Sequence, residues 1–307
     1  MVRPILALLL LFALATFAPP RLYAPLAVPG AVWMTFTPVT VAGSNTGRLT
    51  YLGGWTLASN DPRFGGLSAL HVGPDGILAA SDAGALFRFA LPPASPDLRV
   101  ALIDATASKG ARDIEALSYW RGQLWLAFET RNLVRRLGGG GVEAEAAPAR
   151  MRGWHTNRGA EAMLRLADGR FLIFEEGNTG RTTDALLFAG DPARSGTPHV
   201  ALRYRAPPGY RITDAASLSD GRLLFLNRRL GLTGFAAKLT MGALPPVRPG
   251  ALIEGVEIAD LSAAPLTENL EALSVTRENG RDTVWIASDD NFSPVQRTLL
   301  LKFAIAD

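Results

Sequence analysis

The sequence has 307 residues, 48% of them hydrophobic and 19% charged, with a formal net charge of +3. This composition is that of a folded globular chain, long enough for one large all-β domain or two ordinary ones. It contains no cysteine and only three histidines, which excludes disulfides and thiolate metal sites and disfavours a histidine-rich zinc site. Because two of its arginines lie near the N-terminus, the rest of the chain is close to neutral and no nucleic acid is expected as a partner.

Residues 1–24 are predicted to be a secretory signal peptide, with an uncleaved N-terminal membrane anchor as the alternative. The apolar stretch Ile5–Ala18 follows a basic residue and is short for a membrane span. Prolines stand directly after the best cleavage positions, so both alternatives stay open. Either one predicts a periplasmic or secreted protein, tethered to the inner membrane if the anchor is kept. Residues 25–47 show no periodic pattern and are predicted to be a tether, followed by a domain over 48–307.

One sequence pattern recurs five times along this domain. A polar or acidic residue opens an apolar run, a turn containing glycine follows, and a second apolar run ends on a polar residue. These repeats cover 67–82, 115–129, 161–175, 214–227 and 271–289. Asp-Gly and Asn-Gly between apolar runs are typical of hairpin turns, because such turns require positive φ. The pattern therefore predicts five hairpins.

Further strand-like runs follow most of these hairpins, such as Ala85–Phe89 and His199–Tyr204. Four strands in a repeat of about fifty residues indicate a blade of a β-propeller. The last repeat is one strand short, and the isolated run Arg48–Gly53 is predicted to complete it and close the ring. We expect an all-β propeller of five four-stranded blades. A sixth blade stays open because the 235–268 stretch is long, and an open β-sandwich is the alternative fold.

The polar ends of each hairpin are predicted to meet on one face of the propeller. The spacing from Glu115 to Glu129 and from Glu161 to Glu175 is 14 residues, as it is from Ser68 to Asp82. In a hairpin, the start of the first strand and the end of the second lie at the same end. The acidic residues should therefore surround the mouth of the central channel.

A funnel of this kind needs something to offset its charge. Two carboxylates about 6 Å apart repel by roughly 3 kcal/mol at an effective dielectric near 20. Oxygen donors favour a hard divalent cation, Ca²⁺ over Mg²⁺. We predict Glu115, Glu161 and Glu271 as metal ligands, with Asp82 or Glu175 as general base. The alternative is structural: a carboxylate at a blade start that accepts backbone N–H bonds from the next blade.

Two motifs at the same face are candidates for binding substrate. Arg228 and Arg229 are predicted to hold an oxyanion, although a plain ion pair would explain them too. Asp290 and Asn291 end the last hairpin and complete the predicted substrate-binding set.

The motifs also carry a family resemblance. It rests on Phe64–Ser68 with Ala80–Asp82, Glu161–Ala162 with Glu175–Gly177, Asn227–Arg229, and Asn269–Ala272 with Asp289–Phe292. In their order and spacing these segments resemble the bacterial family called esterase-like activity of phytase, over residues 48 to 305. The resemblance implies a secreted or periplasmic protein that hydrolyses esters or phosphoesters. Asn227 stands where the family often has glutamate, which removes one charge from the funnel.

Two functions follow from these patterns. The first is a metal-assisted hydrolase, monomeric, acting on a small ester or phosphoester substrate. The alternative is a non-catalytic propeller that binds a ligand or a protein. A serine esterase is disfavoured because the segment around Ser68 lacks the second glycine of a nucleophile elbow.

Overall fold

The fold is described from a computed structural model, which covers residues 32–41, 45–91, 97–104, 107–177, 182–232, 234–263 and 266–306. The predicted signal peptide or anchor lies outside these described residues. So does much of the predicted tether. No helix in the described part of the chain has the length and apolar character needed to cross a membrane.

Antiparallel β-strands make up nearly all of the regular secondary structure in the described chain, which confirms the all-β prediction. Four units of four strands follow one another. They comprise β4 (Leu67–Gly73), β5 (Gly76–Ser81), β6 (Ala85–Phe89) and β7 (Leu98–Leu102); β8 (Ile114–Trp120), β9 (Gln123–Phe128), β10 (Leu133–Gly138) and β11 (Gly141–Ala146); β12 (Ala160–Arg165), β13 (Phe171–Glu175), β14 (Thr182–Phe188) and β15 (His199–Arg205); β16 (Arg211–Ser217), β17 (Leu223–Gly231), β18 (Gly234–Gly242) and β19 (Leu252–Asp260). They are called units 1 to 4. A short parallel pairing of β15 with β19 joins units 3 and 4 into one sheet.

Unit 5 combines both ends of the described chain. It contains β20 (Asn269–Glu278), β21 (Arg281–Asp289), β22 (Thr298–Ile305), β3 (Leu49–Ser59) and β1 (Met34–Pro38), with β2 (Asn45–Thr46) beside β3. The antiparallel pairing of β22 with β3 confirms that an N-terminal strand completes the last unit. β1 lies within the predicted tether, and Met34 is buried in the core beside unit 1. Its alternation was too short to stand out in the sequence.

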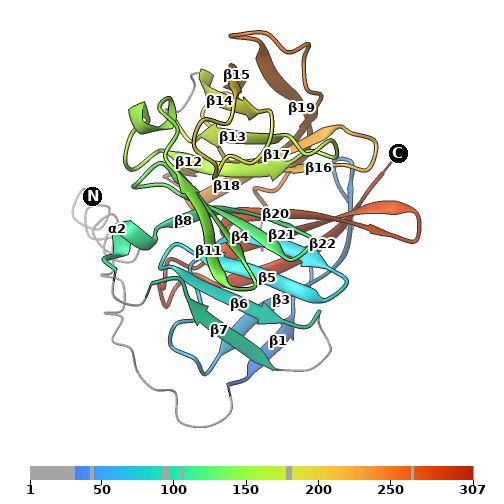
Figure 1. The fold of residues 1–307 in the computed structure, drawn as a ribbon. Helices are drawn as coiled ribbons and strands as arrows, with labels where there is room; N and C mark the ends of the chain where they lie inside the picture. The colour runs from blue at the N-terminus through green and yellow to red at the C-terminus, as the bar shows by residue number, and fades with distance from the viewer. Residues whose placement is uncertain are drawn as a thin grey trace, which may run out of the picture.

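The first strands of the units form a closed ring. β4 contacts β8, β8 contacts β12, β12 contacts β16, β16 contacts β20, and β20 contacts β4. Figure 1 shows these strands toward the middle of the molecule, with β7 and β15 at its periphery. Each of the five apolar core clusters lies between two neighbouring units. Sheets packed face to face around a ring of first strands form a β-propeller.

Two short helical segments lie between units: α2 (Lys109–Arg112) before β8, and the 3₁₀ turn η1 (Met151–Gly153) before β12. α2 delivers Lys109 to the end of the ring where the polar residues gather. The 235–268 stretch, long enough in sequence to suggest a further blade, supplies β18 and β19 of unit 4.

Candidate functional site

A β-bulge recurs near the start of the first strand in all five described units. The pairing of first and second strands slips by one residue at the same place each time. The residues at the slip, here called bulge residues, are Ser68, Glu115, Glu161, Thr213 and Glu271. Because a bulge re-aims the side chain of its extra residue, these five polar groups occupy equivalent positions around the ring.

Two further positions in each unit accompany the bulge. In every unit the residue before the bulge pairs with a residue of the second strand, and the facing residue is the one that follows this partner. The facing residues are Asp82, Glu129, Glu176, Arg228 and Asp289. The leading residues stand two positions before the bulge and pair with the facing residues through the backbone; they are Gly66, Asp113, Gly159, Arg211 and Asn269. These fifteen positions are called the polar ring.

The structure shifts two of the predicted equivalences by one residue. In units 1 and 2 the turn between the first and second strands has two residues. In unit 3 it has three, between Leu166 and Arg170, and in unit 4 it has three, between Leu218 and Arg222. The extra residue places Glu176 rather than Glu175 at the facing position. In unit 4 it places Arg228 there, rather than Asn227, and Thr213 at the bulge.

Unit 2 is acidic at all three positions of the polar ring. Carboxylate oxygens of Asp113, Glu115 and Glu129 lie within 4.8 Å of one another, and this group can hold a metal ion. Burial, followed by the charges of Glu161 and Asp113, raises the pKa of Glu115 well above its ordinary value. Burial and Asp113 likewise raise the pKa of Glu129 to about 8. Three hard oxygen donors that repel one another in this way fit a divalent cation of the Ca²⁺ or Mg²⁺ type.

Asp113 is also raised in pKa, mainly by burial, while a hydrogen bond from the Thr130 hydroxyl at 2.6 Å acts in the opposite direction. Lys109 pairs with Asp82, the facing residue of unit 1, at 2.9 Å. Burial alone would lower the pKa of Lys109, but the charge of Asp82 and its neighbours raises it above the ordinary value. The lysine therefore stays charged at the edge of the acidic group.

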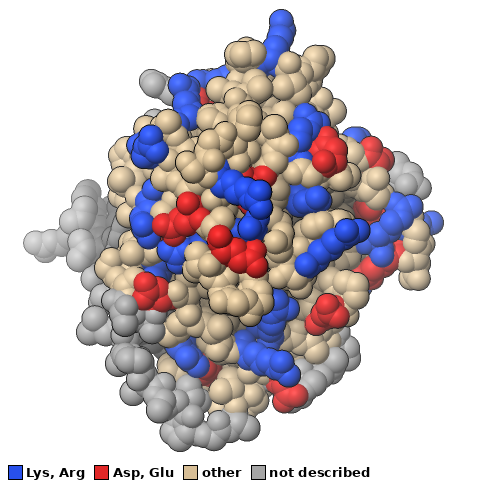
Figure 2. Space-filling model, in the orientation of Figure 1, with Lys and Arg blue, Asp and Glu red and all other residues tan. Residues whose placement is uncertain are grey.

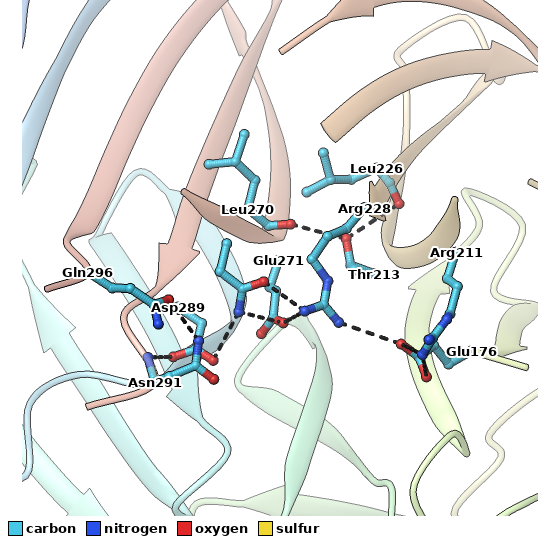
Figure 3. Close-up of polar contacts among 11 residues, drawn as sticks. Glu176, Arg211, Thr213, Leu226, Arg228, Leu270, Glu271, Asp289, Asn291 and Gln296 are labelled. Carbon is cyan, nitrogen blue, oxygen red and sulfur yellow. Dashed lines mark hydrogen bonds and ion pairs between the residues drawn. The ribbon is translucent and has the colours of Figure 1, made fainter. Parts of the chain in front are cut away.

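Units 4 and 5 neutralise their part of the ring with Arg228. Its guanidinium lies 3.0 Å from Glu271 and 3.5 Å from Glu176, and it donates to the Asn269 side chain at 2.7 Å. Arg211 binds the other side of Glu176 at 3.0 Å. Figure 3 shows the resulting chain of alternating charges. Burial disfavours the charge on Arg228, but Glu271 and Glu161 raise its pKa above the ordinary value.

Glu161 lies between the two halves of the ring. It is 6% exposed, and burial followed by the charges of Glu176 and Glu129 raises its pKa well above the ordinary value. Arg228 acts on it in the opposite direction but forms no ion pair with it in the described chain. Glu161 is therefore a buried carboxyl that favours its protonated form.

Asp289, the facing residue of unit 5, accepts a hydrogen bond from the backbone of Asn291 at 2.6 Å. Its pKa is raised well above the ordinary value by burial and then by Glu271. On the face seen in Figure 2, acidic and basic side chains lie side by side near the middle.

The structure thus brings together six of the predicted site residues: Asp82, Glu115, Glu161, Glu271, Arg228 and, through its backbone at the edge, Asn291. It places Glu175 and Arg229 elsewhere, and Asp290 contacts the polar ring through the backbone of Gly66. Glu175 accepts the backbone N–H of Asp184 at 3.3 Å. Arg229 is exposed and stacks on Tyr210, 5.0 Å from the ring centroid.

The Asp290 carboxylate is occupied by hydrogen bonds from the backbone, including one from the loop that precedes β4. One of its oxygens accepts the backbone N–H groups of Gly66 at 2.9 Å and Phe292 at 3.0 Å. The Asn291 side chain donates to Gln296 at 2.9 Å near the surface. Asp214, counted in the sequence as part of the funnel, accepts the backbone N–H of Leu273 and so links β16 to β20.

Sequence reasoning missed four residues of the polar ring as site candidates: Asp113, Glu176, Arg211 and Asn269. Each has a local signal. Asp113 stands two residues before Glu115, and the same offset leads to Arg211 and Asn269 in their units. The rule that first and second strands pair residue by residue, combined with turn length, would have selected Glu176.

Comparison with known proteins gives one family. Residues 62–292 match the Phytase-like family, described as esterase-like activity of phytase. No curated protein matches the sequence.

Three solved structures are similar to this chain. Glutaminyl cyclase of Myxococcus xanthus is 12% identical, with a TM-score of 0.49 over 84% of this chain and 97% of its own. The α-L-arabinofuranosidase of Podospora anserina is 11% identical, with a TM-score of 0.47 over 90% and 98%. The aldose sugar dehydrogenase of Streptomyces coelicolor is 12% identical, with a TM-score of 0.48 over 91% and 100%.

Proposed function

The chain belongs to the Phytase-like family, esterase-like activity of phytase, and from this premise we propose that it hydrolyses small esters or phosphoesters at the polar ring. The observation that carries the proposal is the group formed by Asp113, Glu115 and Glu129, whose oxygens lie within 4.8 Å of one another. The pKa values of Glu115, Glu129 and Glu161 are raised because burial and neighbouring carboxylates disfavour their ionised forms, and such perturbed groups are typical of functional sites.

We propose that Asp113, Glu115 and Glu129 hold a divalent cation, Ca²⁺ in preference to Mg²⁺. Mg²⁺ requires near-ideal octahedral geometry, whereas Ca²⁺ accepts irregular sets of carboxylates. When bound, such an ion polarises an ester or phosphoryl oxygen and lowers the pKa of a bound water. Of the three ligands predicted from sequence, Glu115 stays in the proposed set. Glu271 is held by Arg228, and Glu161 has another role.

Glu161 is the proposed proton carrier. It is buried next to the acidic group, and its raised pKa favours the protonated carboxyl. A protonated carboxyl can donate its proton to the leaving alkoxide, which is general acid catalysis. Asp82, whose carboxylate pairs with Lys109 at 2.9 Å on the edge of the acidic group, is the proposed general base.

Arg211 and Arg228 are proposed to attract the anionic part of a phosphoester. Arg211 keeps 35% of its side chain exposed while it binds Glu176. A ring of carboxylates alone would repel phosphate, and the positive charges of Arg211 and Arg228 would reduce that repulsion.

The remaining predictions complete the proposal. The five units are proposed to be five blades, closed by β3, and the protein to be an extracytoplasmic monomer. A non-catalytic binding propeller is the second candidate. Its support is the pairing of Arg228 with both Glu271 and Glu176, since a self-satisfied network also serves stability alone.

Metal analysis combined with hydrolysis tests the proposal. The purified protein is dialysed against Ca²⁺ and assayed on p-nitrophenyl esters and on p-nitrophenyl phosphate, beside D113N, E115Q and D220N. Asp220 is the control, because it is an exposed aspartate paired with Arg222 at 2.6 Å in the unit 4 turn. We expect about one bound ion per chain and hydrolysis abolished by chelation. Both should be lost in D113N and E115Q and kept in D220N.

Hydrolysis that survives chelation and both acidic substitutions would exclude the metal-assisted mechanism. Ion binding without hydrolysis of any ester would favour the binding propeller instead.

A further inference from the structure

The end of the ring opposite the carboxylates contains a cavity of about 370 Å³. All five first strands line it, with the residues that lead into the hairpin turns, such as His71, Trp120 and Arg165. Among the described residues that line it there is no aspartate or glutamate. The two ends of the ring therefore have opposite chemistry. Its volume is in the range of small-molecule sites.

One arginine without an ionic partner in the described chain, Arg165, lines this cavity, and two more lie over its aromatic residues. The Arg165 guanidinium lies 4.5 Å from the centre of the Trp120 ring, and Arg121 lies 5.0 Å from the same ring. Arg88 lies 5.5 Å from the centre of Tyr119, which also lines the cavity. Within the described chain none of these three arginines forms an ion pair. An anion would therefore meet cations that no carboxylate already neutralises.

Nearby acidic groups do not cancel this charge. Asp168, in the turn after Arg165, is held by Arg170 at 2.7 Å. Hydrogen bonds from Arg170 lower the pKa of Asp168 first, and the charge of Arg165 contributes last. The pairing with Arg170 leaves Arg165 beside the indole.

Ser217 supplies an independent observation. It lines the cavity, and its hydroxyl oxygen is buried without a hydrogen-bond partner in the described structure. A buried polar group without a partner costs about 1–3 kcal/mol relative to one that is satisfied. The protein itself therefore leaves one polar group of the cavity lining unsatisfied.

We propose that this cavity binds a small organic anion with a flat apolar body. The body packs among the first strands and against Trp120, and the anionic group, a carboxylate or a phosphoryl group, lies at Arg165. Each group presents two oxygens that a guanidinium can bind through two hydrogen bonds. This site does not depend on the proposed hydrolase, because its residues lie at the other end of the ring.

Calorimetric titration with phenylphosphonate and with benzoate tests the proposal. Neither has an ester bond, so hydrolysis at the polar ring cannot remove the probe. Phenol has the same ring without the ionised group and is the neutral comparison. We expect both anions to bind and phenol to bind at least about tenfold more weakly. Preference for one anion identifies the anionic group, a phosphoryl group or a carboxylate, that the site takes.

R165M is expected to weaken binding of the anions about tenfold or more. R222M is the matched control, since Arg222 is an exposed arginine in the unit 4 turn, outside the cavity lining, that pairs with Asp220 at 2.6 Å. W120L provides a second test on a residue that is 43% exposed and not needed for the core. It should weaken both anions as well. All variants should keep the Ca²⁺ binding of the unmodified protein.

Equal binding by R165M and R222M would overturn the proposal. So would binding of phenol as tight as that of the anions, or no binding of either anion at about 10 mM. Loss of anion binding in D113N, with R165M unaffected, would place the anion at the polar ring instead.

Discussion

Replacement of Arg228 by methionine should destabilise the protein by about 3–5 kcal/mol, the cost of breaking a buried ion pair from one side. The Arg228 side chain is 22% exposed, while those of Glu271 and Glu176 are 12% and 6% exposed. At 3.0 Å and an effective dielectric near 20, attraction to Glu271 alone is about 5 kcal/mol. Part of this lost attraction is offset, because burying methionine on folding does not carry the desolvation cost of burying a charged guanidinium. The variant nevertheless leaves two buried carboxylates without their shared cation.

The loss of unfolding free energy in R228M should also depend on pH. Burial raises the pKa of Glu271, and Arg228 acts against that rise. Without Arg228 the folded-state pKa of Glu271 rises further. A carboxyl with a raised folded-state pKa contributes stability that is present at low pH and lost as pH rises through that pKa. R228M should therefore lose more stability relative to the unmodified protein at pH 8 than at pH 5.

Urea denaturation followed by tryptophan fluorescence, with chelator present, measures both effects. R229M is the matched control, because Arg229 is the next residue and only stacks on Tyr210 at 5.0 Å. Its loss should be about 0.5–1 kcal/mol and independent of pH. Equal losses for the two variants, or a pH-independent loss for R228M, would refute the charge-balance reasoning.

Three further outcomes are expected. D214A should lose about 1–3 kcal/mol in urea denaturation, since it leaves the Leu273 N–H without its acceptor at 2.6 Å. Thermal denaturation should rank G66A below G122A: both glycines have positive φ, but a Cβ at Gly66 would lie 2.5 Å from an aromatic carbon, whereas one at Gly122 would meet nothing within 4 Å. Chelated protein should lose melting temperature as pH rises from 4.5 to 8, because the pKa of Glu129 is raised to about 8 and its uncharged form favours the fold. Ca²⁺ should oppose this loss, and a melting temperature that climbs over that interval without metal would contradict the reasoning.

The units and their closure could be predicted because their signals are local. Glycine turns such as Gly73–Gly76 and the apolar runs beside them set each hairpin without reference to distant residues. The closing strand could be predicted because the last repeat was one strand short and the strand-like run Arg48–Gly53 belonged to no repeat. β1 was missed since its five residues carry too little pattern to separate a strand from a tether.

The residues of the site were harder to predict, because a single extra residue in a turn changes which side chain faces the polar ring. A three-residue turn between Leu166 and Arg170 moves the partner of the bulge along by one position. Neighbouring residues in a strand point to opposite faces, so this single step exchanges Glu175 for Glu176 at the polar ring. The same alternation separates Arg228 from Arg229, which the sequence treated as a pair.

The distribution of charge around the polar ring locates the site more narrowly than the repeated glutamates do. Three units carry a bulge glutamate, which by itself points to units 2, 3 and 5. Glu271 of unit 5, however, is already bound by Arg228 at 3.0 Å, and Glu176 of unit 3 is bound by two arginines. Unit 2 has no cation of its own at the three ring positions, and Lys109 beside it is held by Asp82. We therefore propose unit 2 as the place where a cation binds, and Glu161 is the bulge carboxyl next to it that no arginine pairs with in the described chain. In this proposal the acidic half of the ring holds the cation, and the arginines of the other half balance Glu271 and Glu176 and face an anionic substrate.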